Sequence, residues 1–168
     1  MYRRKFRKMP TVIIGDLDSL SEATRAAGTR KGQCVVHVAE QDTNDLEKAI
    51  AYCACRQWKN PIIVGAVGKR EDHMIGNIFR GLAHGLEIVT DRGRFMPVNG
   101  KKTLRTGKGA AVSIFAPDAD TRMTSKGLEW PLDEVEFKNL YCATLNRASA
   151  ASITVTSTKP VYVYIEEI

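Results

Sequence analysis

Acidic and other polar side chains of the kind that bind metal ions and phosphates follow three apolar, largely β-branched runs of the chain. The three polar segments are Gly15–Ser19, Gln41–Asp45 and Gly65–His73, which follow Thr11–Ile14, Cys34–Ala39 and Pro61–Val64. Short apolar runs that alternate with helix-length segments are typical of parallel strands in βαβ units. Open parallel sheets bind ligands at the carboxyl ends of their strands. We therefore expect the three segments to share one edge, where they could hold a divalent cation and a polyphosphate.

The first segment places Asp16 and Asp18 one residue apart, just beyond an expected strand. In an extended backbone both carboxylates face the same way, so both could reach one ion. Oxygen ligands of this kind suit Mg²⁺, which usually keeps several waters and is completed by substrate phosphates. The alternative is a strand-to-helix turn in which Asp18 or Ser19 caps a helix over residues 20–26.

The second segment leads into the clearest expected helix, residues 44–58. Asn44 can cap this helix, and Glu47 completes a capping-box pattern. Asp45 lies in the first turn, where the helix dipole favours a carboxylate, so it could stabilise the helix or bind a ligand. Gln41 offers a neutral hydrogen-bonding group at the same strand end.

The third segment is a glycine-containing turn in which Gly68 precedes Arg70 and Asp72, at the start of a second expected helix over residues 72–84. Backbone N–H groups of the turn, the helix N-terminus and a guanidinium would together bind phosphate oxygens. His73 could support this site or simply pack. The chain has no Gly-x-x-x-x-Gly-Lys-Ser/Thr motif, so if the protein binds ATP, it does so without a P-loop.

The composition fits a protein with one ordinary domain or two small ones. The chain has 168 residues, of which 43% are hydrophobic. No apolar stretch approaches the ~18 residues of a membrane span, and the N-terminus lacks the apolar segment of a signal peptide. We therefore expect a cytoplasmic protein without a membrane partner.

The four cysteines should be reduced and buried; they are Cys34, Cys53, Cys55 and Cys142.

The net charge of +6 is concentrated at the N-terminus. Five basic residues lie within the first eight positions, and the rest of the chain is close to neutral. Aromatic residues do not interleave with basic ones elsewhere, so the nucleic-acid footprint is missing. We expect this segment to be a solvated arm or the remnant of a longer N-terminus, and we expect no nucleic-acid partner.

The pattern of apolar and turn-forming residues changes between residues 85 and 92. Beyond that point, short alternating stretches are separated by Gly, Pro, Asp and Asn, which favours an antiparallel sandwich or a small barrel. The stretches are residues 86–90, 95–98, 110–115, 153–155 and 161–165. We expect an α/β domain over residues 1–88 and an all-β domain over residues 89–168.

The three polar segments together resemble those of the thiamine pyrophosphokinase family. That family carries, in this order, Gly-Asp-Phe/Leu-Asp-Ser, Gln-x-x-Thr/Asn-Asp and Gly-x-x-Gly-Arg-x-Asp-His. Two later segments, residues 124–132 and 143–146, also look familial. The resemblance covers about residues 10–165.

The resemblance implies a fold, an activity and a set of site residues. The fold would be a Rossmann-like parallel-sheet domain followed by an antiparallel β-sandwich. The activity would be diphosphate transfer from ATP to thiamine, in a homodimer with thiamine at the subunit interface. Asp16, Asp18 and Asp45 would hold Mg²⁺ with the ATP phosphates, while Arg70 and Asp72 would organise the phosphates and the attacking hydroxyl. The remaining cofactor and substrate contacts would come from Gln41, Asn44, Gly68, Thr144 and Asn146.

Two departures from the family pattern leave other functions open. Residues 1–10 do not supply the early strand that ends in an Ala-Asp-Gly-Ala-like segment and forms part of the family's nucleotide site. Leu145 stands where the family's Thr-Ser-Asn segment has serine. The chain could therefore use another acceptor, such as a hydroxymethylpterin, or bind thiamine or its diphosphate without catalysis. The complete set of acidic and basic site residues argues against a silent binder.

Overall fold

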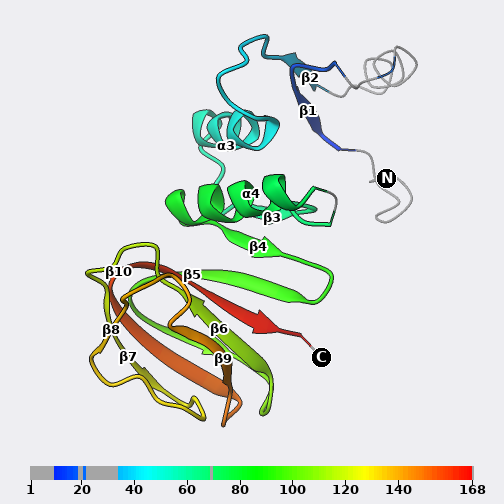
Figure 1. Ribbon diagram of the computed structural model, residues 1–168. Helices are drawn as coiled ribbons and strands as arrows, with labels where there is room; N and C mark the ends of the chain where they lie inside the picture. Colours follow the sequence, from blue (N-terminus) through cyan, green and yellow to red (C-terminus); the bar gives the residue numbers. More distant parts are fainter. Residues whose placement is uncertain (1–9, 19–20, 22–33, 69, 168) are drawn as a thin grey trace. The chain divides into compact units, whose positions relative to one another are not determined.

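The computed structural model describes residues 10–18, 21, 34–68 and 70–167 of the chain (Figure 1). The chain divides into two compact units, residues 1–59 and residues 60–168. In the described residues no helix is long and apolar enough to cross a membrane.

The described residues of the first unit include two parallel strands and a helix. Strand β1 (Val12–Gly15) pairs with β2 (Cys34–His37), with Val12 opposite Cys34 and Gly15 opposite His37. Helix α3 (Asp45–Cys55) follows β2. The side chain of Asn44 caps the helix by accepting a hydrogen bond from the Glu47 backbone N–H at 3.0 Å. The expected cap is confirmed, and the helix ends three residues earlier than expected.

The second unit begins with a strand, a helix and a second strand. Both strands belong to the sheet that the C-terminal half forms. Strands β3 (Ile62–Val64) and β4 (Glu87–Val89) are parallel, and α4 (Glu71–Ala83) connects them. Strand β4 then pairs antiparallel with β5 (Gly93–Arg105). The units therefore divide at residues 59/60, earlier than the change in residue pattern between residues 85 and 92. The reason is that β4 joins β3 to the sheet of the C-terminal half.

The remaining strands extend this sheet into an eight-stranded one whose main order is β3-β4-β5-β10-β6-β9, with β7 paired to β10 and β8 paired to β7. The additional strands are β6 (Ala111–Phe115), β7 (Arg122–Lys126), β8 (Val135–Glu136), β9 (Ala143–Arg147) and β10 (Ser152–Glu166). The two stretches expected at residues 153–155 and 161–165 are one long strand, β10. A register shift between Ser157 and Val161 separates its first half, paired with β7, from its second half, paired with β6.

A single apolar cluster fills the space between these strands. Its fully buried members include Val112, Ile114, Phe137, Val155 and Val163. The burial of alternate residues along β6 and β10 matches the two-residue period of a strand with one face in the core. The unit is thus a mixed, strand-rich structure.

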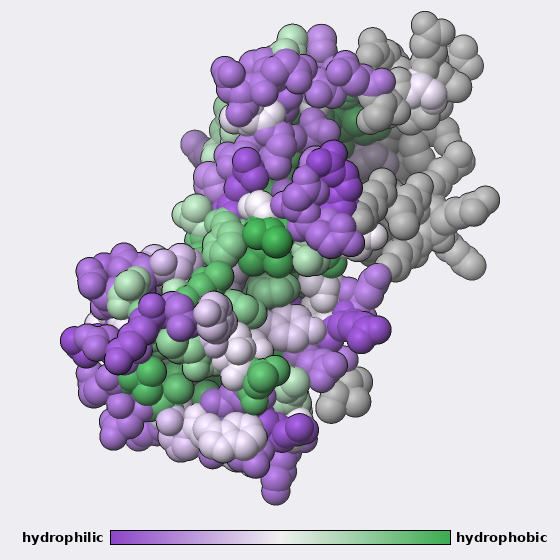
Figure 2. Space-filling view, viewed as in Figure 1, coloured by the Kyte–Doolittle hydropathy of each residue, from purple (hydrophilic) through white to green (hydrophobic). Residues whose placement is uncertain are grey.

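Helix α4 packs closely against this sheet. A β-carbon added to Gly81 would lie 2.5 Å from the Tyr162 hydroxyl and 2.9 Å from Ile88, so only glycine allows this approach. The Tyr162 hydroxyl donates a hydrogen bond to the Leu86 carbonyl, and burial raises the pKa of this phenol. Hydrophobic residues also reach the surface over β3, β4 and α4 (Figure 2); those most exposed there are Ile62, Val64, Ile75 and Phe79.

All four cysteines are free thiols, but the expectation that they are buried is wrong. Cys34, Cys55 and Cys142 are exposed, and Cys53 is half-buried. The surface positions follow from local structure: Cys34 begins the two-stranded sheet, Cys55 ends α3, and Cys142 lies in a turn before β9.

Candidate functional site

The backbone turns sharply where β1 ends, so the expected extended geometry of Asp16 and Asp18 is wrong. Leu17 has a φ of 64°, a left-handed conformation that is costly for a side-chain-bearing residue, and it is buried. Burial of the Leu17 side chain offsets the cost of this conformation and so stabilises the turn. The Asp18 backbone N–H then donates a hydrogen bond to Asp16 Oδ1 at 3.1 Å. Asp18 itself is exposed, and the alternative helix over residues 20–26 lies outside the described residues.

The Asp45 side chain is held at the same end of β1. A β-carbon added to Gly15 would lie 2.6 Å from Asp45 Oδ1 and 3.0 Å from its carboxyl carbon. Glycine at position 15 is therefore required for this approach. The structure brings a carboxylate from the first turn of α3 against the residue that precedes Asp16.

Glu40 organises the connection between β2 and α3, and sequence reasoning missed this role. Its carboxylate accepts hydrogen bonds from the Asp42 and Thr43 backbone N–H groups at 2.9 and 3.0 Å, and from the Thr43 hydroxyl. The Thr43 hydroxyl is the main reason that the pKa of Glu40 lies below its usual range. Lys48, which is buried, has its ammonium 3.8 Å from Glu40 Oε1. Gln41 is left exposed on this fixed loop.

Among the residues that the structure describes, no group of three or more His, Cys, Asp or Glu side chains lies close enough together to hold a metal ion. The donors near the end of β1 are carboxylate oxygens of Asp16 and Asp45. Their chemistry fits Mg²⁺, which accepts a few carboxylates and takes its other ligands from water and phosphate.

The glycine-containing turn of the second unit lies between β3 and α4. Gly65 and Gly68 have φ values of 75° and 99°, which glycine adopts without strain, and added β-carbons there would meet nothing within 4 Å. Asn77 of α4 donates a hydrogen bond to the Ala66 carbonyl at 3.2 Å and ties the turn to the helix. The turn is thus fixed in place while its glycines remain open to a ligand.

Arg70 and Asp72 form a bidentate ion pair at the start of α4. Arg70 Nε lies 3.1 Å from Asp72 Oδ1, and Arg70 Nη2 lies 2.6 Å from Asp72 Oδ2. The hydrogen bonds from Arg70 hold the pKa of Asp72 below its usual range, and the pKa of Arg70 is raised in turn. Both side chains are mostly exposed, so the pair is accessible to a charged ligand.

Asn146 holds the backbone of Trp130. The Asn146 side chain donates a hydrogen bond to the Trp130 carbonyl at 2.7 Å and accepts one from the Trp130 N–H at 3.3 Å. Asn146 is buried, whereas the indole of Trp130 is 56% exposed. Asn146, which was expected in the thiamine pocket, thus fixes the backbone that carries the exposed side chain of Trp130.

Leu145 occupies a bulge in β9. Val112 and Ile114 of β6 pair with Asn146 and Ala143, so one residue of β6 lies opposite two of β9. Leu145 has a φ of 61°, and its side chain is 87% exposed.

Polar groups on either side anchor the bulge. The Leu145 N–H donates a hydrogen bond to Ser113 Oγ at 3.3 Å, and the Thr144 hydroxyl donates one to the Tyr141 carbonyl at 3.1 Å. Tyr141 is itself 65% exposed. Sequence reasoning missed Trp130 and Tyr141 as surface aromatics, although both lie in or beside the two later familial segments.

Two family models match successive parts of the chain. The model for the catalytic domain of thiamin pyrophosphokinase matches residues 1–89, and the model for the substrate-binding domain of thiamin pyrophosphokinase matches residues 93–164. Among curated proteins, the chain is similar to thiamine pyrophosphokinase 3 of Oryza sativa subsp. japonica, with 29% identity over 92% of the chain and 64% of the relative. It is also similar to thiamine pyrophosphokinase of Bacillus subtilis, with 27% identity over 74% of the chain and 63% of the relative.

Solved structures share the fold. A thiamin pyrophosphokinase from Candida albicans matches with a TM-score of 0.84 and 14% identity over 99% of this chain and 77% of its own. A thiamin pyrophosphokinase from Geobacillus thermodenitrificans matches with a TM-score of 0.77 and 24% identity over 100% of this chain and 82% of its own. The chain spans 64% of the length of the rice relative. With family models matched over both halves, the chain belongs to the thiamin pyrophosphokinase family.

Proposed function

We propose that the protein is a thiamine diphosphokinase, which transfers diphosphate from ATP to the hydroxyl group of thiamine and forms thiamine diphosphate and AMP. The observation that carries the proposal is the succession of the two family models, catalytic then substrate-binding, over residues 1–89 and 93–164. The names of the curated relatives support the same reaction.

We propose that the ATP phosphates bind at the three polar segments. Asp16, Asp18 and Asp45 would hold Mg²⁺, and the bound ion would offset the negative charge of the phosphates. The contact between Asp45 and Gly15 supports this set, because it keeps the Asp45 carboxylate at the end of β1, next to the residue that precedes Asp16. Backbone N–H groups near Gly68, together with Gln41 and Asn44, would add neutral hydrogen bonds to the nucleotide.

Arg70 would neutralise charge that develops on the transferred group. In the reaction the thiamine oxygen forms a bond to the β-phosphorus of ATP, and the bond from that phosphorus to the oxygen shared with the α-phosphorus breaks, so AMP leaves. Catalysis of this kind depends mainly on positioning and electrostatic stabilisation. We assign Asp72 as the acceptor of the hydroxyl proton; its contact with Arg70 keeps it ionised, although it lowers its basicity.

We propose that thiamine binds near Thr144 and Asn146, with Asn146 acting through the Trp130 segment that it holds. The exposure of Trp130, Tyr141 and Leu145 supports an apolar or aromatic partner at this surface. A second copy of the chain would complete the site in a homodimer, with thiamine at the interface.

We also keep the finer fold assignment as a proposal. Residues 1–88 would form the Rossmann-like domain that binds ATP, and residues 89–168 would form the β-sandwich that binds thiamine. The parallel pair β1–β2 supports the first assignment, and the antiparallel pairs of β5 to β10 support the second. We assign the reaction to the cytoplasm, where ATP is abundant.

The direct test is to incubate the purified chain with ATP, Mg²⁺ and thiamine and to measure AMP and thiamine diphosphate. Equal amounts of both products are expected. Folded protein that forms neither product would contradict the proposed activity. Products formed only when a hydroxymethylpterin replaces thiamine would redirect the assignment of the acceptor.

A further inference from the structure

A cationic surface, distinct from the residues assigned above, lies on one face of strands β5, β10 and β7. Alternate residues of these strands face solvent while their neighbours are buried: Leu104, Ile153, Val155 and Met123 point into the core. The solvent side carries Lys101, Thr103 and Arg105 on β5, Ser152, Thr154 and Thr156 on β10, and Arg122, Thr124 and Lys126 on β7. We call these nine residues the basic sheet face.

The pairing register arranges the charges along the two outer strands and the hydroxyl groups between them. Thr154 pairs with Thr103 on one side and with Lys126 on the other, and Ser152 pairs with Arg105. A hydrogen bond of 2.9 Å between the Thr103 and Thr154 hydroxyls shows that both point to this face. Neighbouring strands lie about 4.8 Å apart, so the two cationic lines are roughly 10 Å apart.

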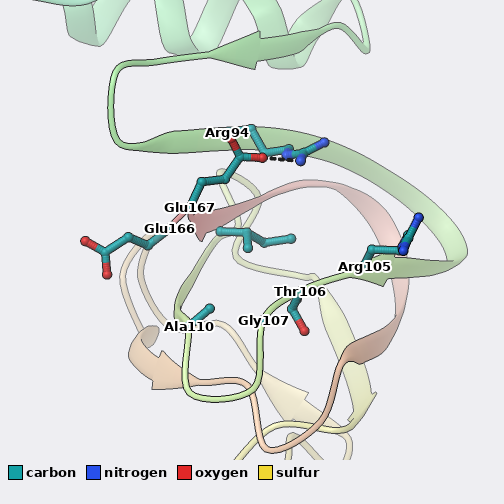
Figure 3. Close-up of a pocket in the computed structure, with 8 residues that line it drawn as sticks. Arg94, Arg105, Thr106, Gly107, Ala110, Glu166 and Glu167 are labelled. Atoms are coloured by element: carbon teal, nitrogen blue, oxygen red, sulfur yellow. Dashed lines mark hydrogen bonds and ion pairs between the residues drawn. The ribbon is translucent and has the colours of Figure 1, made fainter.

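Three of the cations have no acidic partner in the part of the chain that the structure describes. Among the described residues, Lys101, Arg105 and Lys126 form no ion pair, whereas Arg122 is paired with Glu136 at 2.7 Å. None of the nine residues of the basic sheet face is acidic. Figure 3 shows that Arg105 points away from the nearby carboxylates of Glu166 and Glu167, the second of which is bound by Arg94. The face therefore has uncompensated positive charge.

We propose that the basic sheet face binds the phosphate backbone of a nucleic-acid duplex without regard to sequence. Lysine, arginine, serine and threonine side chains are the groups that contact phosphate oxygens in such complexes. The face has no aromatic residue, so it lacks the stacking platform that single strands require. It also has no apolar side chain to insert into a lipid surface. Charge complementarity and hydroxyl groups thus favour the duplex.

The fold changes the expectation from sequence because it gathers cations that are far apart in the chain. Lys101, Arg105 and Lys126 lie in two segments separated by a stretch of the chain that contains both acidic and basic residues, so charge counted along the sequence there is nearly balanced. Strand pairing places them on one surface.

The test measures duplex binding by fluorescence anisotropy, with a labelled 20-base-pair DNA duplex, over a series of salt concentrations. The starting chain has Arg3, Arg4, Lys5, Arg7 and Lys8 changed to serine, so that the N-terminal arm does not contribute. A variant of that chain then carries Lys101→Ser, Arg105→Ser and Lys126→Ser. A matched control carries Lys59→Ser, Lys108→Ser and Lys138→Ser, three exposed cations off the face.

The proposal predicts that the face variant loses affinity on the order of 100-fold at 0.1 M salt and that its slope of log K against log salt falls by about 2.7, the value for three phosphate contacts. The control should keep the slope of the starting chain. Equal binding by the face variant and the control would overturn the proposal, and so would no duplex binding by the starting chain. Vesicles containing phosphatidylserine serve as a parallel probe, and binding to them alone would overturn the proposal in favour of a membrane. Unchanged thermal unfolding midpoints show that the variants are folded.

Discussion

The carboxylate of Asp45 rests against the backbone of Gly15, close enough that an added β-carbon would lie 2.6 Å from Asp45 Oδ1. Two segments that are thirty residues apart therefore meet at the end of β1 through a glycine that leaves room for an acid. Asn44 supports the contact, because its side chain fixes the first turn of the helix that carries Asp45.

Gly15→Ala should displace the Asp45 carboxylate and lower the turnover of ATP by 10-fold or more, with a raised requirement for Mg²⁺. The physical reason is that a methyl group cannot occupy space already held by a carboxylate oxygen. Initial rates over a range of Mg²⁺ concentrations provide the measurement. Gly107→Ala is the matched control, since an added β-carbon there meets nothing within 4 Å; equal rates for the two variants would refute the role of this contact.

Asp18→Asn should abolish Mg²⁺-dependent turnover and leave the fold intact. The amide keeps the size of the side chain but removes the negative charge that a hard cation requires. Turnover and the circular dichroism spectrum would be measured together, with Asp42→Asn as the control on another exposed acid. Full activity in Asp18→Asn would remove Asp18 from the proposed metal site.

Arg70→Gln should raise the pKa of Asp72 toward its usual range, because Arg70 provides the hydrogen bonds that lower it. A carboxyl with a lowered pKa in the folded state stabilises the fold above its unfolded pKa and loses that contribution as the pH falls through its folded pKa. In the variant the folded and unfolded pKa values of Asp72 would be nearly equal, so this contribution would be absent, and the acid limb of the pH–rate profile would move to higher pH. Carbon NMR of the Asp72 carboxyl group measures the shift, and Arg92→Gln should leave it unchanged.

Asn146→Ala should lower the free energy of unfolding by about 1–3 kcal/mol, because it leaves the Trp130 backbone groups without their partner. Urea unfolding followed by tryptophan fluorescence measures this change. Asn99→Ala, at an exposed position, is the control and should have little effect. If Asn146 served only as a thiamine ligand, its removal would raise the KM for thiamine without any loss of stability.

Local patterns were sufficient to predict most of the elements. The apolar runs before the three polar segments correspond to β1, β2 and β3, and the capping pattern at Asn44 begins α3 as expected. The polar strands β7 and β9 were missed, because Arg122–Lys126 and Ala143–Arg147 contain few of the apolar residues that mark a strand. Their partners β10 and β6 supply the burial that these sequences do not signal.

The site was predicted as residue types and not as geometry. Asp16 and Asp18 were expected on an extended backbone, but the burial of Leu17 in a left-handed conformation turns the chain between them. Two contacts depend on side-chain directions that sequence spacing does not encode. They are the ion pair between Arg70 and Asp72 and the hydrogen bonds between the Asn146 side chain and the Trp130 backbone. The role of Glu40 was not predicted, because Glu40 fixes the loop before α3 through contacts with Thr43 and Lys48 that only the structure shows.

The pairing of β4 with β5 has a consequence for how this chain can be divided. The two family models meet between residues 89 and 93, within the hairpin whose strands pair at Ile88 with Phe95 and at Val89 with Arg94. A fragment that begins between β4 and β5 would expose the edge of β5 and remove Leu86, whose carbonyl accepts the Tyr162 hydrogen bond. The part of the chain matched by the substrate-binding model shares its sheet with β3 and β4, which lie in the part matched by the catalytic model, so cutting the chain between the two models would leave that sheet incomplete.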